Sequence, residues 1–204
     1  MRMIFYLVAA LLLASLSCNQ KPKAVQEKEN VVRDSIRIPK SPEEFESYLQ
    51  SYMESLRNAQ MKFAEKDYKG AIADYTKIIE NPSIFSGDGG PLGVFILRGI
   101  ARDSLKDYKG AIDDYTKAIE KSTRNDAEPY IKRGLSKSSL KDYEGAIDDF
   151  TKCLEFDPNN LWIYYYRGLV KIESGDKNGG CEDLKIAADR NASNTKEAIK
   201  KYCQ

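Results

Sequence analysis

Few side chains in this sequence could carry out chemistry. Its 204 residues contain no histidine, so the commonest general base, the usual partner of a Ser or Cys nucleophile and the commonest metal ligand are all missing. Paired carboxylates would remain, but the candidates Asp103 and Glu173 have no characteristic spacing. The four cysteines are scattered without CxxC spacing, which makes metal ligation improbable. We therefore expect no catalytic, cofactor or metal site.

The charge balance bears on the class of partner. The chain has 32 Lys and Arg against 31 Asp and Glu, a formal net charge of +1. Because no strongly basic field exists to attract phosphates, we expect no nucleic-acid partner.

The first eighteen residues, "MRMIFYLVAALLLASLSC", differ from the rest. Arg2 precedes an apolar run that is shorter than the roughly 20 residues of a membrane-spanning helix, and small residues follow it. This pattern predicts a signal peptide over residues 1–17, with an uncleaved anchor as the alternative. Cys18 resembles the lipidated cysteine of bacterial lipoproteins, which implies cleavage before it and acylation by palmitate or a similar chain. Ser15-Leu16-Ser17 also suits an ordinary signal peptidase, which would leave Cys18 unmodified.

Residues 18–40 are expected to be a lipidated N-terminus and a flexible tether, and they are polar and nearly free of aromatic residues. Such a composition buries too little apolar surface to offset the entropy of ordering, so we expect a spacer. "SPEE" then predicts a helix start, with Ser41 as N-cap, Pro42 in the first turn and Glu44 placed for a capping box.

One sequence motif occurs three times. "KDYKGAIADYTKIIE" begins at Lys66, "KDYKGAIDDYTKAIE" at Lys106 and "KDYEGAIDDFTKCLE" at Lys141, and a worn fourth copy, "GDKNGGCEDLKIAAD", begins at Gly175. A small residue stands twelve positions before the central Ala or Gly of each copy, and bulky residues follow at helical spacing. The pattern predicts pairs of helices that approach closely through small residues and fill their seam with bulky ones.

A period near 34 residues with this pattern resembles the tetratricopeptide repeat (TPR). The clearest copy, residues 127–160, ends in the family's "DPNN". The resemblance implies an all-α fold, a right-handed α-solenoid of about four helix-turn-helix units with a C-terminal capping helix. The expected TPR domain covers 41–204, with units at 52–91, 92–126, 127–160 and 161–194 and a cap at 195–204. A Gly- and Pro-rich insertion at 81–91 is expected to form a loop that either takes part in recognition or is merely tolerated.

Two charged positions depart from the family's usual residues. Arg precedes the small residue in every unit except the first, where Asn58 stands, and Asp follows the central Ala or Gly by three residues in all four. We therefore predict that each Arg binds the Asp of the preceding unit, in the pairs Arg98–Asp74, Arg133–Asp114 and Arg167–Asp149; the alternative is that these are surface charges paired with whatever lies near. Basic residues also replace a usual aromatic, and they predict a solvated strip: Lys62, Arg102, Lys137 and Lys171.

The last unit and the cap each carry a cysteine. After export, Cys181 and Cys203 would lie in an oxidising compartment, so a bridge between them is one expectation and two unrelated thiols the other. Cys153 replaces a small seam residue and is expected to be a buried free thiol.

The resemblance implies that the first helices of successive units line a concave groove for a partner peptide or helix. By the family's pattern, the partner-binding residues are Ile96, Ile100, Ile131, Leu135, Trp162, Tyr165, Tyr166 and Leu169. The asparagine with which chaperone-binding TPR domains clamp a terminal carboxylate has no counterpart here, so that activity is not expected. The alternative for Trp162 and Tyr166 is packing against the cap, and Tyr164 is expected in the core.

We therefore expect a non-enzymatic scaffold that binds a protein partner. The predicted location is the envelope of a double-membrane bacterium, most simply an outer-membrane lipoprotein facing the periplasm or the surface. The alternative is a soluble periplasmic or secreted adaptor that lacks the lipid.

Overall fold

The computed structural model describes residues 41–81, 92–122, 126–188 and 195–204. The expected signal peptide, Cys18, the tether and all but the first residue of the predicted insertion lie outside these ranges.

Helices make up almost all of the described chain. In order they are α3 (Pro42–Ala64), α4 (Tyr68–Glu80), α5 (Leu92–Ser104), α6 (Tyr108–Lys121), α7 (Glu128–Ser139), α8 (Tyr143–Phe156), α9 (Leu161–Glu173), α10 (Lys177–Ala188) and α11 (Thr195–Tyr202). No helix in these ranges is both long enough and apolar enough to span a membrane.

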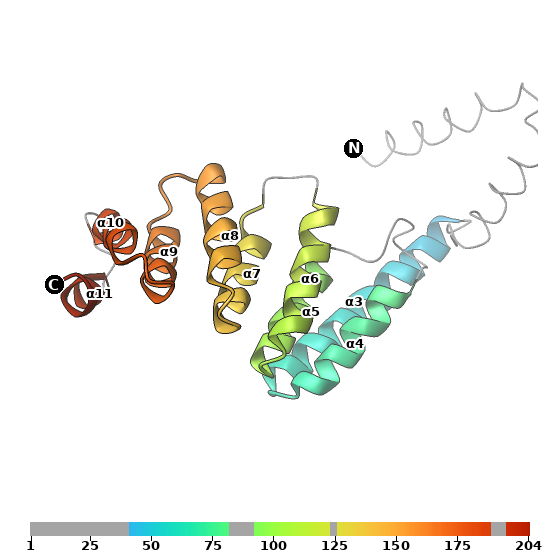
Figure 1. Cartoon of the computed structure of the whole chain (residues 1–204). Coiled ribbons are helices and arrows are strands. Elements are labelled where there is room, and N and C mark those ends of the chain that lie inside the picture. The colour runs from blue at the N-terminus through green and yellow to red at the C-terminus, as the bar shows by residue number, and fades with distance from the viewer. Residues whose placement is uncertain (1–40, 82–91, 123–125, 189–194) are drawn as a thin grey trace, which may run out of the picture.

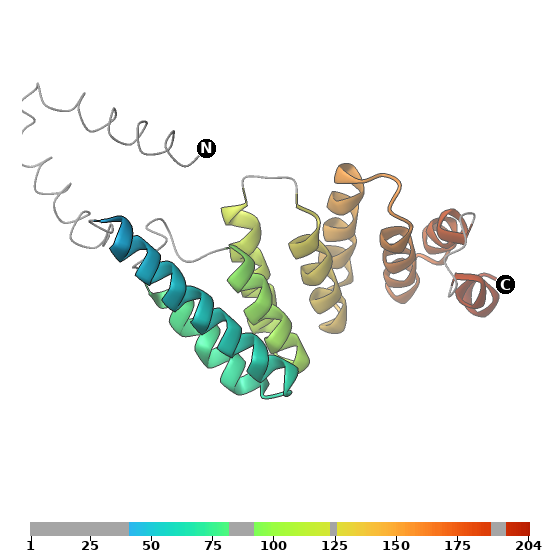
Figure 2. The ribbon, with the colours of Figure 1, turned by 180° about the vertical axis from the view of Figure 1, so that it is seen from behind.

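The helices pack as consecutive pairs. Within each of the pairs α3/α4, α5/α6, α7/α8 and α9/α10 the two helices lie against each other, and the second helix of a pair also contacts the first helix of the next. The pairs follow one another along an elongated array, with α3 near one end and α11, packed on α10, at the other (Figures 1 and 2). The expectation of an α-solenoid with four units and a capping helix is confirmed.

The repeated "KD" forms the turn inside a unit. Lys66, Lys106 and Lys141 adopt φ values of 61–64°, and in the fourth unit Gly175 takes the corresponding left-handed turn with φ 101°. This conformation ends the first helix. The following Asp then caps the second helix; Asp107, for example, accepts a hydrogen bond from the Gly110 N–H at 3.1 Å.

Small residues bring the two helices of a unit together. In the fourth unit a Cβ on Gly180 would lie 2.6 Å from the Gly168 carbonyl oxygen, closer than real contacts allow. In the second and third units the glycines Gly99 and Gly134 instead face the rings of Tyr115 and Phe150, both fully buried. The repeated motif therefore specifies the contact between the two helices of a unit, and it supplies no catalytic group.

The first helix of the described residues, α3, begins as predicted. The Ser41 hydroxyl accepts a hydrogen bond from the Glu44 N–H at 3.2 Å, and Pro42 occupies the first turn. The resulting α3 has 23 residues, whereas α5 and α9 have 13 each. Residues 42–51 thus extend α3 ahead of the first repeat unit.

Candidate functional site

Each arginine of the first helices binds the aspartate of its own unit. Arg98 Nη2 lies 2.6 Å from Asp114 Oδ1, and its Nε lies 3.0 Å from Oδ2. The third and fourth units repeat this two-pronged geometry in Arg133–Asp149 and Arg167–Asp183. The prediction that arginine pairs with the aspartate of the preceding unit is therefore wrong for all three pairs, Arg98–Asp74, Arg133–Asp114 and Arg167–Asp149.

The arginines nevertheless reach the preceding unit, through a threonine. The third nitrogen of Arg98, Nη1, donates to Thr76 Oγ1 of α4 at 3.0 Å. Arg133–Thr116 and Arg167–Thr151 repeat this contact at 3.1 Å. Two residues along a helix correspond to about 200° of rotation, so Thr76 faces the next unit while Asp74 faces its own first helix. That rotation explains why the predicted aspartate partner was wrong, although a contact between the arginine and the preceding unit was predicted correctly.

The predicted solvated strip is a second layer of ion pairs. One helical turn after the arginine position, each basic residue binds the same aspartate of its unit, in the pairs Lys62–Asp74, Arg102–Asp114, Lys137–Asp149 and Lys171–Asp183. The side chains of the last three basic residues are 18–23% exposed, so the prediction of a solvated face is wrong for them. Lys62, at 41%, is the most exposed of the four.

An aromatic ring lies beneath each arginine. The guanidinium carbons of Arg133 and Arg167 each lie 5.5 Å from the ring centroid three residues earlier, Tyr130 and Tyr164, and Arg98 lies over Phe95 in the same way. Tyr164 is half-buried against the third-unit core, in keeping with the expected core position. The arginine, aspartate, threonine and aromatic ring thus form a ladder that joins neighbouring units.

Asp103 is committed to contacts inside the protein. It accepts hydrogen bonds from the Tyr115 hydroxyl and from Ser136 Oγ of the next unit, both at 2.7 Å. Burial raises the pKa of the Asp103 carboxyl, and burial and this hydrogen bond raise that of Tyr115. The contact with Ser136 also shows that α5 and α7 lie side by side, as first helices of one row.

The predicted partner-binding residues divide by exposure. Ile96 is only 6% exposed and packs with Phe95 and Tyr115, so the expectation that it faces a partner is wrong: it points towards α6. The others are half-buried or exposed; Ile100, Ile131 and Leu135 lie with one side against the core clusters. The solvent-exposed parts of these three side chains and of Leu169 are the apolar surface that a partner could contact on α5, α7 and α9.

A cluster of aromatic residues lies at the start of α9. The Trp162 side chain is 52% exposed, and its ring meets that of Tyr165 edge-on at 6.4 Å. Tyr165 in turn contacts Tyr166, whose ring stacks on buried Phe150 at 6.1 Å. Trp162 is thereby supported from below while its outer face stays open to solvent.

The cysteines occupy two environments. Cys181 and Cys203 form a disulfide that joins α10 to the end of α11, with their Cα atoms 5.7 Å apart. Cys153 is a free thiol that is 1% exposed, and burial raises its pKa to about 12. No group of three His, Cys, Asp or Glu side chains in the described ranges is placed to hold a metal ion.

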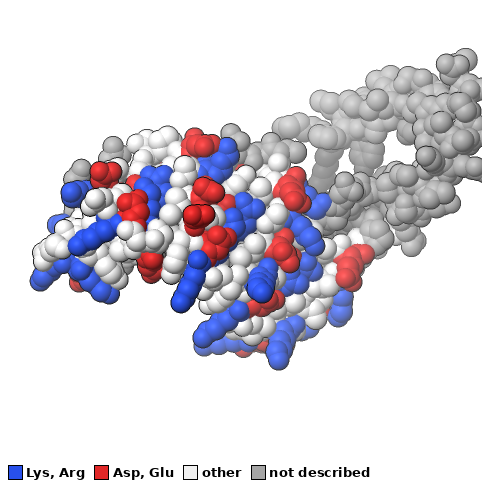
Figure 3. All heavy atoms as spheres, in the orientation of Figure 1, with Lys and Arg blue, Asp and Glu red and all other residues white. Residues whose placement is uncertain are grey.

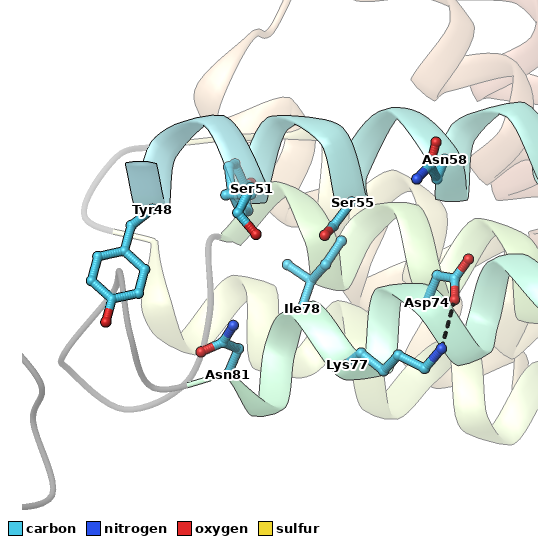
Figure 4. Close-up of a pocket in the computed structure, with 9 residues that line it drawn as sticks. Tyr48, Ser51, Ser55, Asn58, Asp74, Lys77, Ile78 and Asn81 are labelled. Atoms are coloured by element: carbon cyan, nitrogen blue, oxygen red, sulfur yellow. Dashed lines mark hydrogen bonds and ion pairs between the residues drawn. The ribbon is translucent and has the colours of Figure 1, made fainter. Parts of the chain in front are cut away.

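A pocket of about 230 Å³ lies at the N-terminal end of the array, between α3 and α4 (Figure 4). Ser51, Ser55 and Asn58 line it from α3, Lys77 lines it from α4, and Asn81 lines it from the C-cap of α4. Lys77 also binds Asp74, as the dashed line shows. The sequence interpretation placed the candidate site on the first helices of later units and missed this pocket.

Two features of the sequence indicate the end of the array where this pocket lies. Asn58 stands where the later units have the linking arginine, which marks a face without a preceding unit. The capping signal at Ser41 lies eleven residues before the expected unit start at Tyr52, which predicts a helix longer than the repeat requires. Together they predict an extended first helix at the end of the array that no preceding unit covers.

Residues 127–160 match the family model described as tetratricopeptide repeat. This match and the consecutive packed helix pairs together identify the architecture. The fold is a tetratricopeptide-repeat solenoid. No curated protein matches the chain.

Solved TPR structures resemble this solenoid over most of its length. YrrB, described as a TPR protein with an unusual peptide-binding site, superposes with a TM-score of 0.64 at 18% identity, over 87% of this chain and 86% of that one. MamA from Desulfovibrio magneticus RS-1 gives 0.60 at 16%, over 68% and 74%. The first TPR of Spaghetti (RPAP3), bound to the HSP90 peptide SRMEEVD, gives 0.52 at 18%, over 55% and 90%. At these identities the likeness concerns the fold.

Proposed function

We propose that this TPR solenoid is a non-enzymatic scaffold that binds a peptide or helix of a partner protein along α5, α7 and α9. The observation that carries the proposal is the exposed Trp162 ring, which packs edge-on against the partly buried ring of Tyr165. Tryptophan and tyrosine give large contact areas with little loss of side-chain entropy, which favours them as binding hot spots. YrrB is described as having a peptide-binding site and the Spaghetti domain is bound to a peptide, which supports the same use here.

The rest of the row suits an extended partner. Ile100, Ile131, Leu135 and Leu169 lie on three successive first helices and are each partly exposed. The Asp103–Ser136 hydrogen bond fixes α5 against α7, and the arginine ladder fixes each unit on the one before it. A surface held in this way loses little freedom when a partner binds. The face drawn in Figure 3, which has the orientation of Figure 1, carries interspersed acidic and basic side chains.

A crosslinking pull-down from the source cells tests the binding surface. We expect the wild-type chain to capture a discrete partner, and Trp162→Ala/Tyr165→Ala to weaken its binding by roughly 2 kcal/mol or more, about thirtyfold. Leu140→Ala is the matched control, because Leu140 is 40% exposed but lies in the turn between α7 and α8. Equal affinities for the wild type and the double variant would place the partner elsewhere.

We further propose that Cys18 anchors the scaffold to a bacterial envelope membrane through attached acyl chains. Support comes from the sequence alone: an apolar leader ending in small residues and a cysteine, followed by a polar tether. Several acyl chains anchor firmly because each buried CH₂ contributes about 0.8 kcal/mol. The second candidate is a soluble exported adaptor with the leader cleaved and no lipid.

Metabolic labelling separates these two candidates. We expect labelled palmitate to enter the wild-type chain and to be lost in Cys18→Ser. Mass spectrometry of the mature N-terminus should show a mass increase on Cys18. An unmodified N-terminus would favour the soluble adaptor.

A further inference from the structure

The N-terminal end of the solenoid carries an exposed apolar stripe. Phe45, Leu49 and Met53 are 43, 37 and 52% exposed. Because they are four residues apart, they lie on one face of α3, and together we call them the head stripe. Exposed apolar side chains that share one helix face are a candidate binding surface.

The head stripe lies mainly on the part of α3 that the repeats do not need. Residues 42–51 precede the first unit, and the paired helix α4 has 13 residues against the 23 of α3. In Figure 2, where α3 is in front, its blue N-terminal end extends away from the other units. None of the three stripe residues lines the pocket between α3 and α4.

The surroundings of the stripe are acidic. Glu43, Glu44, Glu46 and Glu54 lie on the same stretch of helix, and the first basic residue of α3 is Arg57. An occupant that suits this surface should combine apolar side chains with positive charge.

A second copy of the chain fits this end poorly. Stacking another solenoid in register would need the arginine–threonine link, but Asn58 replaces the arginine at this end and Lys185 replaces the threonine in the last unit. The far end is also covered by α11, held there by its disulfide. Pairing two head stripes would bring two acidic surfaces together, which like charges oppose.

The segment before α3 has the complementary composition. We propose that residues 31–38, "VVRDSIRI", bind along the head stripe. They supply the apolar Val31, Val32, Ile36 and Ile38, with Arg33 and Arg37 to meet the glutamates. The segment ends three residues before Ser41, where α3 begins.

The lengths allow this contact. Eight extended residues span at most about 26–29 Å, whereas the stripe from Phe45 to Met53 runs about 12 Å along the helix. Because the segment is attached next to its binding surface, its effective concentration is of millimolar order, so even weak contacts keep it bound. Residues 19–30 would then remain as the spacer.

Trypsin cleavage of the full-length chain tests the contact. Cleavage after Arg37 reports the segment, and cleavage after Lys23 in the same chain is the internal reference. Since proteolysis of a transiently released segment follows its free population, we expect Phe45→Ser/Leu49→Ser to raise the Arg37/Lys23 rate ratio by about tenfold. The cleaved sequence is identical in both proteins, and both substituted residues are exposed, so the fold should persist.

Leu105→Ser/Leu140→Ser is the matched control, because both leucines are 40% exposed but lie in turns of later units; its ratio should equal that of the wild type. An unchanged ratio in Phe45→Ser/Leu49→Ser would overturn the proposal. So would protection that grows with protein concentration, which indicates a second copy, or that requires phosphatidylethanolamine/phosphatidylglycerol vesicles, which indicates a membrane.

Discussion

Replacing Asp114 by alanine is expected to destabilise the solenoid by about 3–5 kcal/mol, because a buried cation loses its partner. The Asp114 side chain is fully buried and binds both Arg98 and Arg102. Arg98 is itself only 8% exposed at its side chain, so it cannot turn to water without breaking its contact with Thr76 of the preceding unit. The melting temperature should fall by roughly 10 °C.

Thermal and urea unfolding followed by circular dichroism would measure this loss. Asp74→Ala is the matched control in the first unit, where the partners Lys62 and Lys77 have side chains 41% and 76% exposed and can be solvated by water. We expect a much smaller loss there. Equal losses for Asp74→Ala and Asp114→Ala would contradict the assignment of the ladder as a buried link between units.

Replacing Cys203 by serine is expected to cost about 3 kcal/mol, the chain-entropy estimate for a bridge that closes a loop of this length. Cys181 and Cys203 are 22 residues apart in sequence. The cap α11 has eight residues, too few for a stable helix by itself, so its place on α10 depends on the bridge and on buried Ala198. Without the bridge, α11 should fray and expose the outer side of the last unit.

The measurement compares unfolding with and without dithiothreitol. Reductant should lower the midpoint of the wild type to that of Cys203→Ser and leave the variant unchanged, and hydrogen exchange should accelerate first in α10 and α11. A wild-type midpoint that does not respond to reductant would show that the bridge adds no stability.

The repeat units could be predicted from sequence because each is local. "KD" encodes a left-handed turn and an N-cap within a few residues, and the small and bulky positions of one unit meet each other across that turn. The start of α3 at Ser41 was predictable for the same reason, since a cap involves only neighbouring residues.

The ladder could be predicted only in part. The absence of arginine from the first unit correctly indicated a contact with the preceding unit. The wrong partner was chosen because Asp and Thr lie two residues apart, and only the rotation of the helix decides which faces its own unit. Exposure could not be predicted either: Ile96, Ile131 and Tyr165 each stand three residues before the small glycine of their unit, yet Ile96 is 6% exposed and the other two are half-buried.

The sequence by itself determined the period, the helix pairs, their turns and the residues that fill each seam, because these depend on spacing within about 34 residues. The tertiary structure decided which aspartate each arginine binds, which apolar residues stay open, and that the extended α3 leaves a stripe and a pocket at the first unit. Those outcomes depend on how neighbouring units rotate against each other, and on which faces the two ends of the array leave uncovered.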